Sequence, residues 1–156
     1  MEKYFDLYND ELDYIAGYRY SDKGYAVMEA YRKCRRHHVV EVTIGKSHNK
    51  IVRNVSEPEA HEAYVEARAK VDNYMNEQFL LLNKFLEDSK IEALADSRYM
   101  PCRIDVGVNS FKLKDEDWNK IEGYLKKTYG KTMDWKFEGK VYMIASRINL
   151  GKAVFE

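Results

Sequence analysis

The chain has 156 residues, of which 45% are hydrophobic and 33% charged, a size and composition typical of one compact globular domain. This balance excludes a disordered chain, and no apolar stretch approaches the roughly 20 residues that a membrane-spanning helix needs. Since 26 basic residues offset 26 acidic ones, the overall positive field of a protein that coats duplex DNA is excluded as well.

The first third of the chain predicts two helices. Apolar residues at helical spacing over 4–16 favour a short acidic helix that Gly17 ends. After a turn at 21–24, a second helix is expected to bury one apolar side and to carry cations toward its C-terminal end, where they complement the helix dipole. The first six residues lack the basic and apolar regions of an export signal, so we expect a soluble, cytoplasmic protein.

The middle of the chain predicts a hairpin followed by a long helix. Val40, Val42 and Ile44 alternate with polar residues, and β character resumes over 51–55 after a short polar turn. Ser56 and Glu59 then form the Ser-x-x-Glu pattern of a capping box, which marks a helix start. An apolar stripe continues from there to Leu86, so this helix is expected to span about thirty residues, or roughly 45 Å.

The last third predicts a strand over 104–108, a helix over 115–130 and a closing hairpin over 133–145 whose last strand is central. Together these elements indicate an α+β fold over one domain, residues 1–156. We expect a mainly antiparallel sheet of about four to five strands, with a long central helix and two or three shorter helices that cover one face.

Motifs that carry chemistry are scarce. No phosphate-binding glycine loop, nucleophile elbow or metal-type histidine spacing occurs, so we expect no cofactor and no metal. Cys34 and Cys102 lie far apart outside any CxxC pattern, which predicts reduced, structural cysteines. A divalent-metal nuclease remains an alternative through Asp105, Glu138 and Lys140, because two carboxylates can hold Mg²⁺ while a lysine assists the attacking water.

The densest charge cluster runs from Arg32 to His38, where six of seven residues are basic. Seven tyrosines precede it between Tyr4 and Tyr31, and tyrosine supplies a large contact area with a polar tip. Three interpretations stay open: the run binds a protein partner, it binds nucleic acid, or it pairs with the acidic first helix. The candidate contacts are Tyr18, Tyr20, Arg32, Lys33, Arg35, Arg36 and His37.

No segment carries the motif of a known family. The general profile, which is small, charge-rich and tyrosine-rich, resembles that of many phage or mobile-element accessory proteins that occlude a host machine, such as anti-CRISPR or other anti-defence inhibitors. The leading hypothesis is therefore a non-enzymatic protein-interaction module. A nucleic-acid-binding protein and a metal-dependent nuclease are the alternatives.

Overall fold

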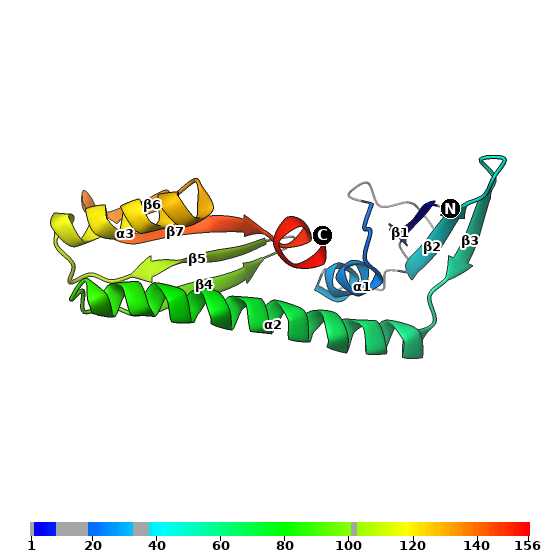
Figure 1. The fold of residues 1–156 in the computed structure, drawn as a ribbon, viewed down its shortest axis with the longest axis horizontal. Coiled ribbons are helices and arrows are strands. Elements are labelled where there is room, and N and C mark those ends of the chain that lie inside the picture. Colours follow the sequence, from blue (N-terminus) through cyan, green and yellow to red (C-terminus); the bar gives the residue numbers. More distant parts are fainter. Residues whose placement is uncertain (1, 9–18, 33–37, 101–102) are drawn as a thin grey trace. The chain divides into compact units, whose positions relative to one another are not determined.

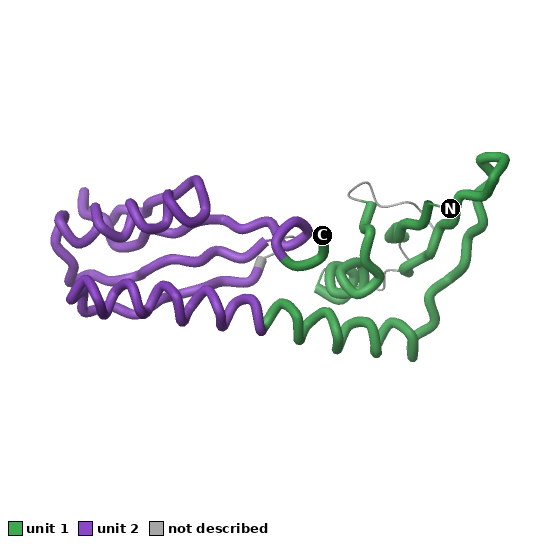
Figure 2. Tube along the Cα trace, in the orientation of Figure 1, with its two compact units in different colours: residues 1–72, 154–156 green, residues 73–153 purple. Residues whose placement is uncertain are grey.

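The computed structural model describes residues 2–8, 19–32, 38–100 and 103–156 (Figure 1). It contains two antiparallel sheets, of three and four strands, together with a 32-residue helix, so the predicted α+β class is confirmed. The strands are divided between two sheets, whereas one sheet was expected. The chain separates into two compact units, residues 1–72 with 154–156 and residues 73–153 (Figure 2). The single domain expected over 1–156 stays a prediction.

Unit 1 is built on a three-stranded sheet of order β1-β2-β3. The strands are β1 (Glu2–Tyr8), β2 (His38–Ile44) and β3 (Lys50–Asn54). The last two form the predicted hairpin. The helix predicted over 4–16 is wrong for residues 4–8, which are part of β1; residues 9–16 lie outside the described residues. All seven residues of β1 pair with β2, and its aromatic residues suit a buried strand, so long-range pairing overrides the local helical spacing.

The helix α1 (Lys23–Arg32) begins where the turn at 21–24 predicted it. Asp22 caps it, because its carboxylate accepts a hydrogen bond from the backbone N–H of Tyr25 at 3.0 Å. Gly24 lets α1 approach the long helix closely: a Cβ at this position would lie 2.7 Å from the Cβ of Ala67 and 2.8 Å from the carbonyl oxygen of Ala63. The backbones of the two helices therefore approach so closely that no side chain fits at residue 24.

The long helix α2 (Glu57–Asp88) confirms the prediction made from its capping box and apolar stripe. The backbone N–H of Glu59 donates to Oγ of Ser56 at 3.4 Å, which is one half of the box. The Glu59 side chain is directed elsewhere, to Arg53 and Lys23. The helix contributes its first part to unit 1 and the remainder to unit 2, the boundary falling after Asp72 (Figure 2).

Unit 2 contains a four-stranded sheet of order β4-β5-β7-β6. Its elements are β4 (Ala95–Met100), β5 (Arg103–Asn109), α3 (Asp115–Tyr129), β6 (Met133–Phe137) and β7 (Lys140–Asn149). The π-helical turn η1 (Gly151–Phe155) follows β7, and its last two residues belong to unit 1. The last strand is central, as predicted. The strand β4 was not predicted, because its sequence ADSRYM lacks the alternation of apolar residues that marks a half-buried strand.

One face of this sheet is buried beneath helices. Ile104, Val106 and Val108 alternate along β5 and are fully buried, as are Ile121 and Leu125 of α3, which packs against β7. The helices α2 and α3 contact each other through stacked rings of Phe85 and Tyr124, whose centroids are 4.6 Å apart. The opposite face carries exposed polar residues, among them Arg98 and Arg147. Unit 2 therefore has a core on one side of its sheet and charged side chains on the other.

Candidate docking surface

The predicted basic patch lies mostly outside the described residues, which include only Tyr20 and Arg32 of its candidates. Arg32 is the last residue of α1, is half-buried and has a partner within the chain. Tyr20 is only 4% exposed, and its ring meets that of Tyr25 edge-on at 5.2 Å. The remaining candidates, Tyr18, Lys33, Arg35, Arg36 and His37, fall in the undescribed segments.

The expected role of Tyr20 as an exposed contact is corrected by this burial. The backbone of Tyr20 exchanges two hydrogen bonds with Phe5, of 2.8 and 3.0 Å, and so adds a bridge to the free side of β1. This pairing brings the ring into unit 1, where it packs beneath α1. The number of tyrosines in the sequence does not show which of them are buried. The burial of Tyr20 depends on a bridge to Phe5, 15 residues away, that no local sequence pattern predicts.

The three residues of the nuclease alternative are not brought together. Asp105 pairs with Arg147 near one end of β7, whereas Lys140 pairs with Phe137 at the other end, seven residues or roughly 23 Å away along the strand. Asp105 is buried, and its Oδ1 lies 3.7 Å from Nε of both Arg103 and Arg147.

Glu138 lies in the exposed turn between β6 and β7. Among the described residues, no group of three or more acidic, histidine or cysteine side chains is placed to hold a metal ion. Asp105, Glu138 and Lys140 therefore do not form the metal site that their order in the sequence suggested.

Three aromatic rings, two exposed and one half-buried, lie together at one end of the four-stranded sheet, and we call Phe111, Phe137 and Tyr142 the aromatic cluster. Phe111 stacks on Tyr142 with centroids 5.2 Å apart and planes within 7°. Phe137 meets Phe111 edge-on at 6.4 Å. Phe111 is 74% exposed and Phe137 60% exposed. These rings contact one another in water instead of packing into the core, which is unusual for phenylalanine.

Local backbone features hold the aromatic cluster in place. Glu138 and Gly139 have φ angles of 50° and 79°, so a tight two-residue turn with two positive φ values joins Phe137 to Lys140. The β6–β7 register also shifts, because Trp135 pairs with Met143 whereas Lys136 pairs with Val141. Tyr142 is therefore the extra residue of a β-bulge, and a bulge changes the direction of the side chains around it.

The connection between β5 and α3 supplies the third ring. The backbone N–H of Ser110 donates to the carbonyl oxygen of Tyr142 at 2.8 Å, which places Phe111 beside the bulge. The Ser110 hydroxyl oxygen then accepts a hydrogen bond from the backbone N–H of Lys112 at 3.1 Å and stabilises the turn after Phe111. A phenylalanine between polar residues just beyond a strand end was the only signal in the sequence that could have identified this surface.

Charged side chains of both signs surround the aromatic cluster along the chain. Lys112, Lys114, Lys136 and Lys140 are exposed and, within the described part of the chain, none of them forms an ion pair. The first turn of α3 follows at once with Asp115, Glu116 and Asp117. The rim is therefore polar and mixed in charge, around an apolar centre, which is the usual composition of a protein interface.

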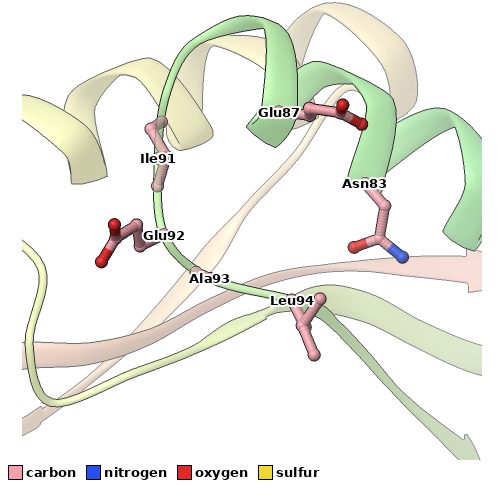
Figure 3. Close-up of a pocket in the computed structure, with 6 residues that line it drawn as sticks. All are labelled: Asn83, Glu87, Ile91, Glu92, Ala93 and Leu94. Atoms are coloured by element: carbon pink, nitrogen blue, oxygen red, sulfur yellow. The ribbon is translucent and has the colours of Figure 1, made fainter.

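A second surface feature of unit 2 is an open depression of about 470 Å³ where α2 leads into β4 (Figure 3). It is lined by Asn83, Glu87, Ile91, Glu92, Ala93 and Leu94. The Asn83 side chain has a structural task here, because its Oδ1 accepts the backbone N–H of Ala95 at 2.8 Å and so fixes the start of β4. Neither Glu87 nor Glu92 forms an ion pair with another described residue, so the depression is acidic.

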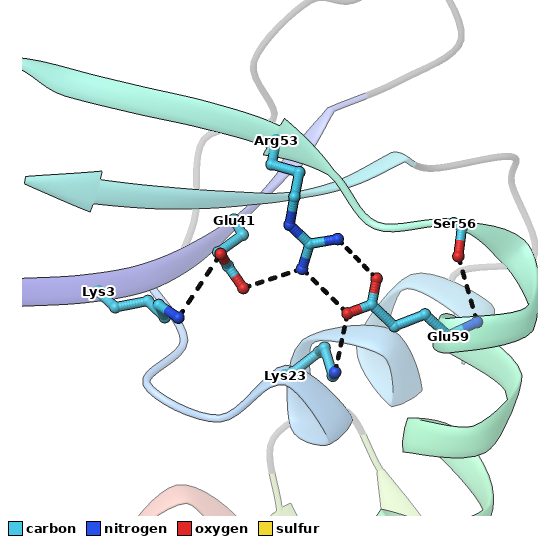
Figure 4. Close-up of polar contacts among 6 residues, drawn as sticks. All are labelled: Lys3, Lys23, Glu41, Arg53, Ser56 and Glu59. Carbon is cyan, nitrogen blue, oxygen red and sulfur yellow. Dashed lines mark hydrogen bonds and ion pairs between the residues drawn. The ribbon is translucent and has the colours of Figure 1, made fainter.

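Unit 1 contains a network of ion pairs that connects three strands and two helices (Figure 4). Arg53 lies between Glu59 and Glu41, Lys23 reaches Glu59 at 3.0 Å, and Lys3 reaches Glu41 at 3.6 Å. The hydrogen bonds from Arg53 and then Lys23 lower the pKa of Glu59 to about 2, and those from Arg53 lower the pKa of Glu41 as well. We interpret this network as structural, because each carboxylate is already occupied by cations of the same unit.

No protein-family model matches the chain, and neither a curated protein nor a solved structure gives a significant match. None of the helices in the described part of the chain combines the length and the apolar content that a membrane span requires.

Proposed function

We propose that the chain is a non-enzymatic protein-interaction module whose partner docks on the aromatic cluster. The observation that carries the proposal is the stacking of Phe111 on Tyr142 while Phe111 remains 74% exposed. An aromatic ring that is held in one orientation and left in water is the kind of anchor that contributes most to protein interfaces.

The free energy available from this surface supports the proposal. Moving an exposed phenylalanine side chain out of water contributes about 1.5–3 kcal/mol. The two-residue turn after Phe137 and the bulge at Tyr142 already restrict the rings, so their docking loses little conformational entropy. Phe111 and Phe137 are therefore the residues that we expect to determine affinity.

The charges beside the aromatic cluster favour a protein over a nucleic acid. Aromatic rings near lysines can stack on bases, but single-strand binding also needs a groove of one positive sign to follow the phosphates. Lys112 and Lys114 are followed immediately by Asp115, Glu116 and Asp117, and the chain as a whole is neutral. This mixture weakens attraction for a polyanion and suits the polar rim of a protein interface.

Two narrower points of the hypothesis rest on the sequence alone. The basic run 32–38 is a second proposed contact for the same partner, to be tested by changing Arg32, Arg35 and Arg36 to Glu. The idea that binding occludes a host machine is prompted by the general resemblance of the chain to phage or mobile-element inhibitors. Both extend the proposed function without altering its central surface.

The decisive experiment compares two double variants in affinity purification from the native host, followed by identification of the retained proteins. Phe111→Ser with Phe137→Ser should reduce retention of the partner at least tenfold, because truncation of an interface anchor costs about 2 kcal/mol. Leu80→Ser with Leu94→Ser is the matched control, since both leucines are exposed in unit 2 and lie outside the aromatic cluster. It should retain the partner as the unchanged protein does.

Three outcomes would count against the proposal. Equal retention by both double variants would show that the aromatic cluster is not the docking surface. Loss of retention by the leucine variant alone would move the surface to α2 and the α2–β4 connection. Retention that disappears after nuclease treatment and falls steeply with salt would instead establish nucleic-acid binding.

A further inference from the structure

The strand β3 (Lys50–Asn54) is an open edge of the three-stranded sheet. Among the strands of the described residues it pairs with β2 alone, on one side, and all five of its residues are exposed. Ile51 and Val52 are 63% and 60% exposed although they point to opposite faces, as neighbours in a strand do. An edge strand with apolar side chains on both faces is a template for pairing with another strand.

The hydrogen-bond pattern of the hairpin shows which residues face this open edge. The bonds from Val55 N–H to the Val39 carbonyl (2.9 Å) and from Gly45 N–H to the Asn49 carbonyl (2.8 Å) bracket the β2–β3 ladder. In an antiparallel ladder, hydrogen-bonded and non-bonded pairs alternate, so Arg53 and Ile51 direct their backbone groups toward β2. Lys50, Val52 and Asn54 therefore direct theirs outward.

The side chains also leave an incomplete apolar row at this edge. Tyr4, Val42 and Val52 are directly opposite one another across β1, β2 and β3, so they form one apolar row. Tyr4 and Val42 are buried, but Val52 at the end of the row is exposed. A fourth strand on β3 would cover Val52 and extend the row by one further position.

We infer that β3 pairs with β3 of a second copy of this chain, antiparallel, about a two-fold axis beside Val52. In this register Val52 lies opposite Val52 of the copy, Lys50 opposite Asn54, and Ile51 opposite Arg53. The three outward-facing residues of each strand then exchange about six backbone hydrogen bonds. Both copies use the same five residues, as a two-fold interface requires.

Avoidance of like-charge pairs permits a second copy as the occupant and selects this register. Neither Lys50 nor Arg53 meets a like charge in it, and the Arg53 guanidinium is already neutralised by Glu41 and Glu59. A two-fold axis beside Lys50 would place two ammonium groups directly opposite each other, which is destabilising. An axis beside Asn54 would bring Ser56, at the start of α2, against the partner strand and shorten the ladder.

The inference is tested by disulfide trapping in the full chain. Val52→Cys places two thiols on the two-fold axis, where opposed Cα atoms about 5.5 Å apart permit a disulfide. Ile51→Cys is the matched control, because residue 51 is about as exposed as residue 52. In the proposed register the two copies of residue 51 are displaced by two positions along the strands, so their Cα atoms are about 8 Å apart, too far for a disulfide. Both variants keep the native Cys34 and Cys102. We expect at least tenfold more covalent dimer from Val52→Cys, and equal yields would overturn the inference.

A second measurement does not depend on added thiols. A single strand pair buries little area, so self-association should be weak and visible as a rise in sedimentation-equilibrium mass with concentration. Val52→Pro removes the outward N–H without breaking the β2 ladder, and it should lower the association constant about tenfold, whereas Val52→Thr should not. A monomeric mass at every concentration, or an unchanged association constant for Val52→Pro, would refute the pairing.

This inference and the proposed function fail separately. Phe111→Ser with Phe137→Ser alters unit 2 only and should self-associate as the unchanged protein does. Val52→Pro should keep the partner that the aromatic cluster retains.

Discussion

Arg53 donates two hydrogen bonds to the carboxylate of Glu59, from Nη1 to Oε1 at 2.8 Å and from Nη2 to Oε2 at 2.9 Å (Figure 4). The same Nη2 donates to Oε2 of Glu41 at 3.0 Å. The two bonds to Glu59 join β3 to the first turn of α2, and the bond to Glu41 joins it to the neighbouring strand β2. The edge strand is therefore held in position by a side chain whose charge is already satisfied, while its outward backbone groups remain available.

The pH dependence of stability should reflect this contact. The pKa of Glu59 lies at about 2 in the folded chain, below its ordinary value of 4.5, so ionisation of Glu59 favours the folded state. That contribution is complete above pH 4.5 and is lost as the pH falls through 2. The urea midpoint of unfolding, measured from pH 7 to pH 2, should decrease below pH 4.5. Glu59→Gln should make this decrease smaller. Identical slopes for the two proteins would contradict the assignment.

Gly107 should be intolerant of any side chain. A Cβ on this residue would lie 2.1 Å from the carbonyl oxygen of Ile144 and 2.6 Å from Cα of Ala145, and both belong to the adjacent strand backbone. We expect Gly107→Ala to lower the free energy of unfolding by about 1–3 kcal/mol. Gly123→Ala is the control, because nothing lies within 4 Å of its Cβ, and it should raise α3 stability by up to about 1 kcal/mol. Urea denaturation compares them.

The hydroxyl of Tyr129 should stabilise unit 2. It donates to Oε1 of the buried Gln78 at 2.6 Å, and burial raises the pKa of Tyr129 well above the ordinary value of a phenol. Tyr129→Phe would leave the Gln78 amide oxygen without its donor, at a cost of about 1–2 kcal/mol. Tyr124→Phe is matched, because no described residue hydrogen-bonds its hydroxyl, and it should be nearly neutral. Equal thermal midpoints for both variants would oppose this role.

Asn83 should set the junction between α2 and β4. Its Oδ1 accepts the Ala95 N–H at 2.8 Å, so Asn83→Ala leaves the first donor of β4 without a partner and should cost about 1 kcal/mol. Hydrogen exchange at Ala95 should accelerate about tenfold. Asn76→Ala, an exposed position on the same helix, should change neither quantity.

The parts of the fold that were predictable carry their signals locally. The β2–β3 hairpin, the start of α2 and the helix α3 are each marked by alternation, a cap or a helical stripe within a few residues. The strand β1 was missed because its buried run at Tyr4–Leu7 also fits a helical spacing, and only pairing with β2 decides between the two. The strand β4 was missed because it is polar.

The candidate site was less predictable than the fold. The residue types of Asp105, Glu138 and Lys140 suggest a metal-binding constellation, but the antiparallel register separates Asp105 from the other two along β7. Conversely, Phe111 and Tyr142 are distant in sequence and meet only because β7 carries one residue more than β6 at that point. A register shift of one residue has no signature in composition or periodicity, so such a surface emerges only from coordinates.

That extra residue on β7 also means that the surface can be altered by a single deletion. Loss of the single codon for Tyr142 would let Lys136 and Trp135 face successive residues of a regular ladder, since Val141 and Met143 already oppose them. The fold would survive, because no fully buried residue of the sheet is removed. Related chains could therefore gain or abandon the stacked ring through one in-frame indel, at a position where ordinary substitutions would leave the strand geometry unchanged.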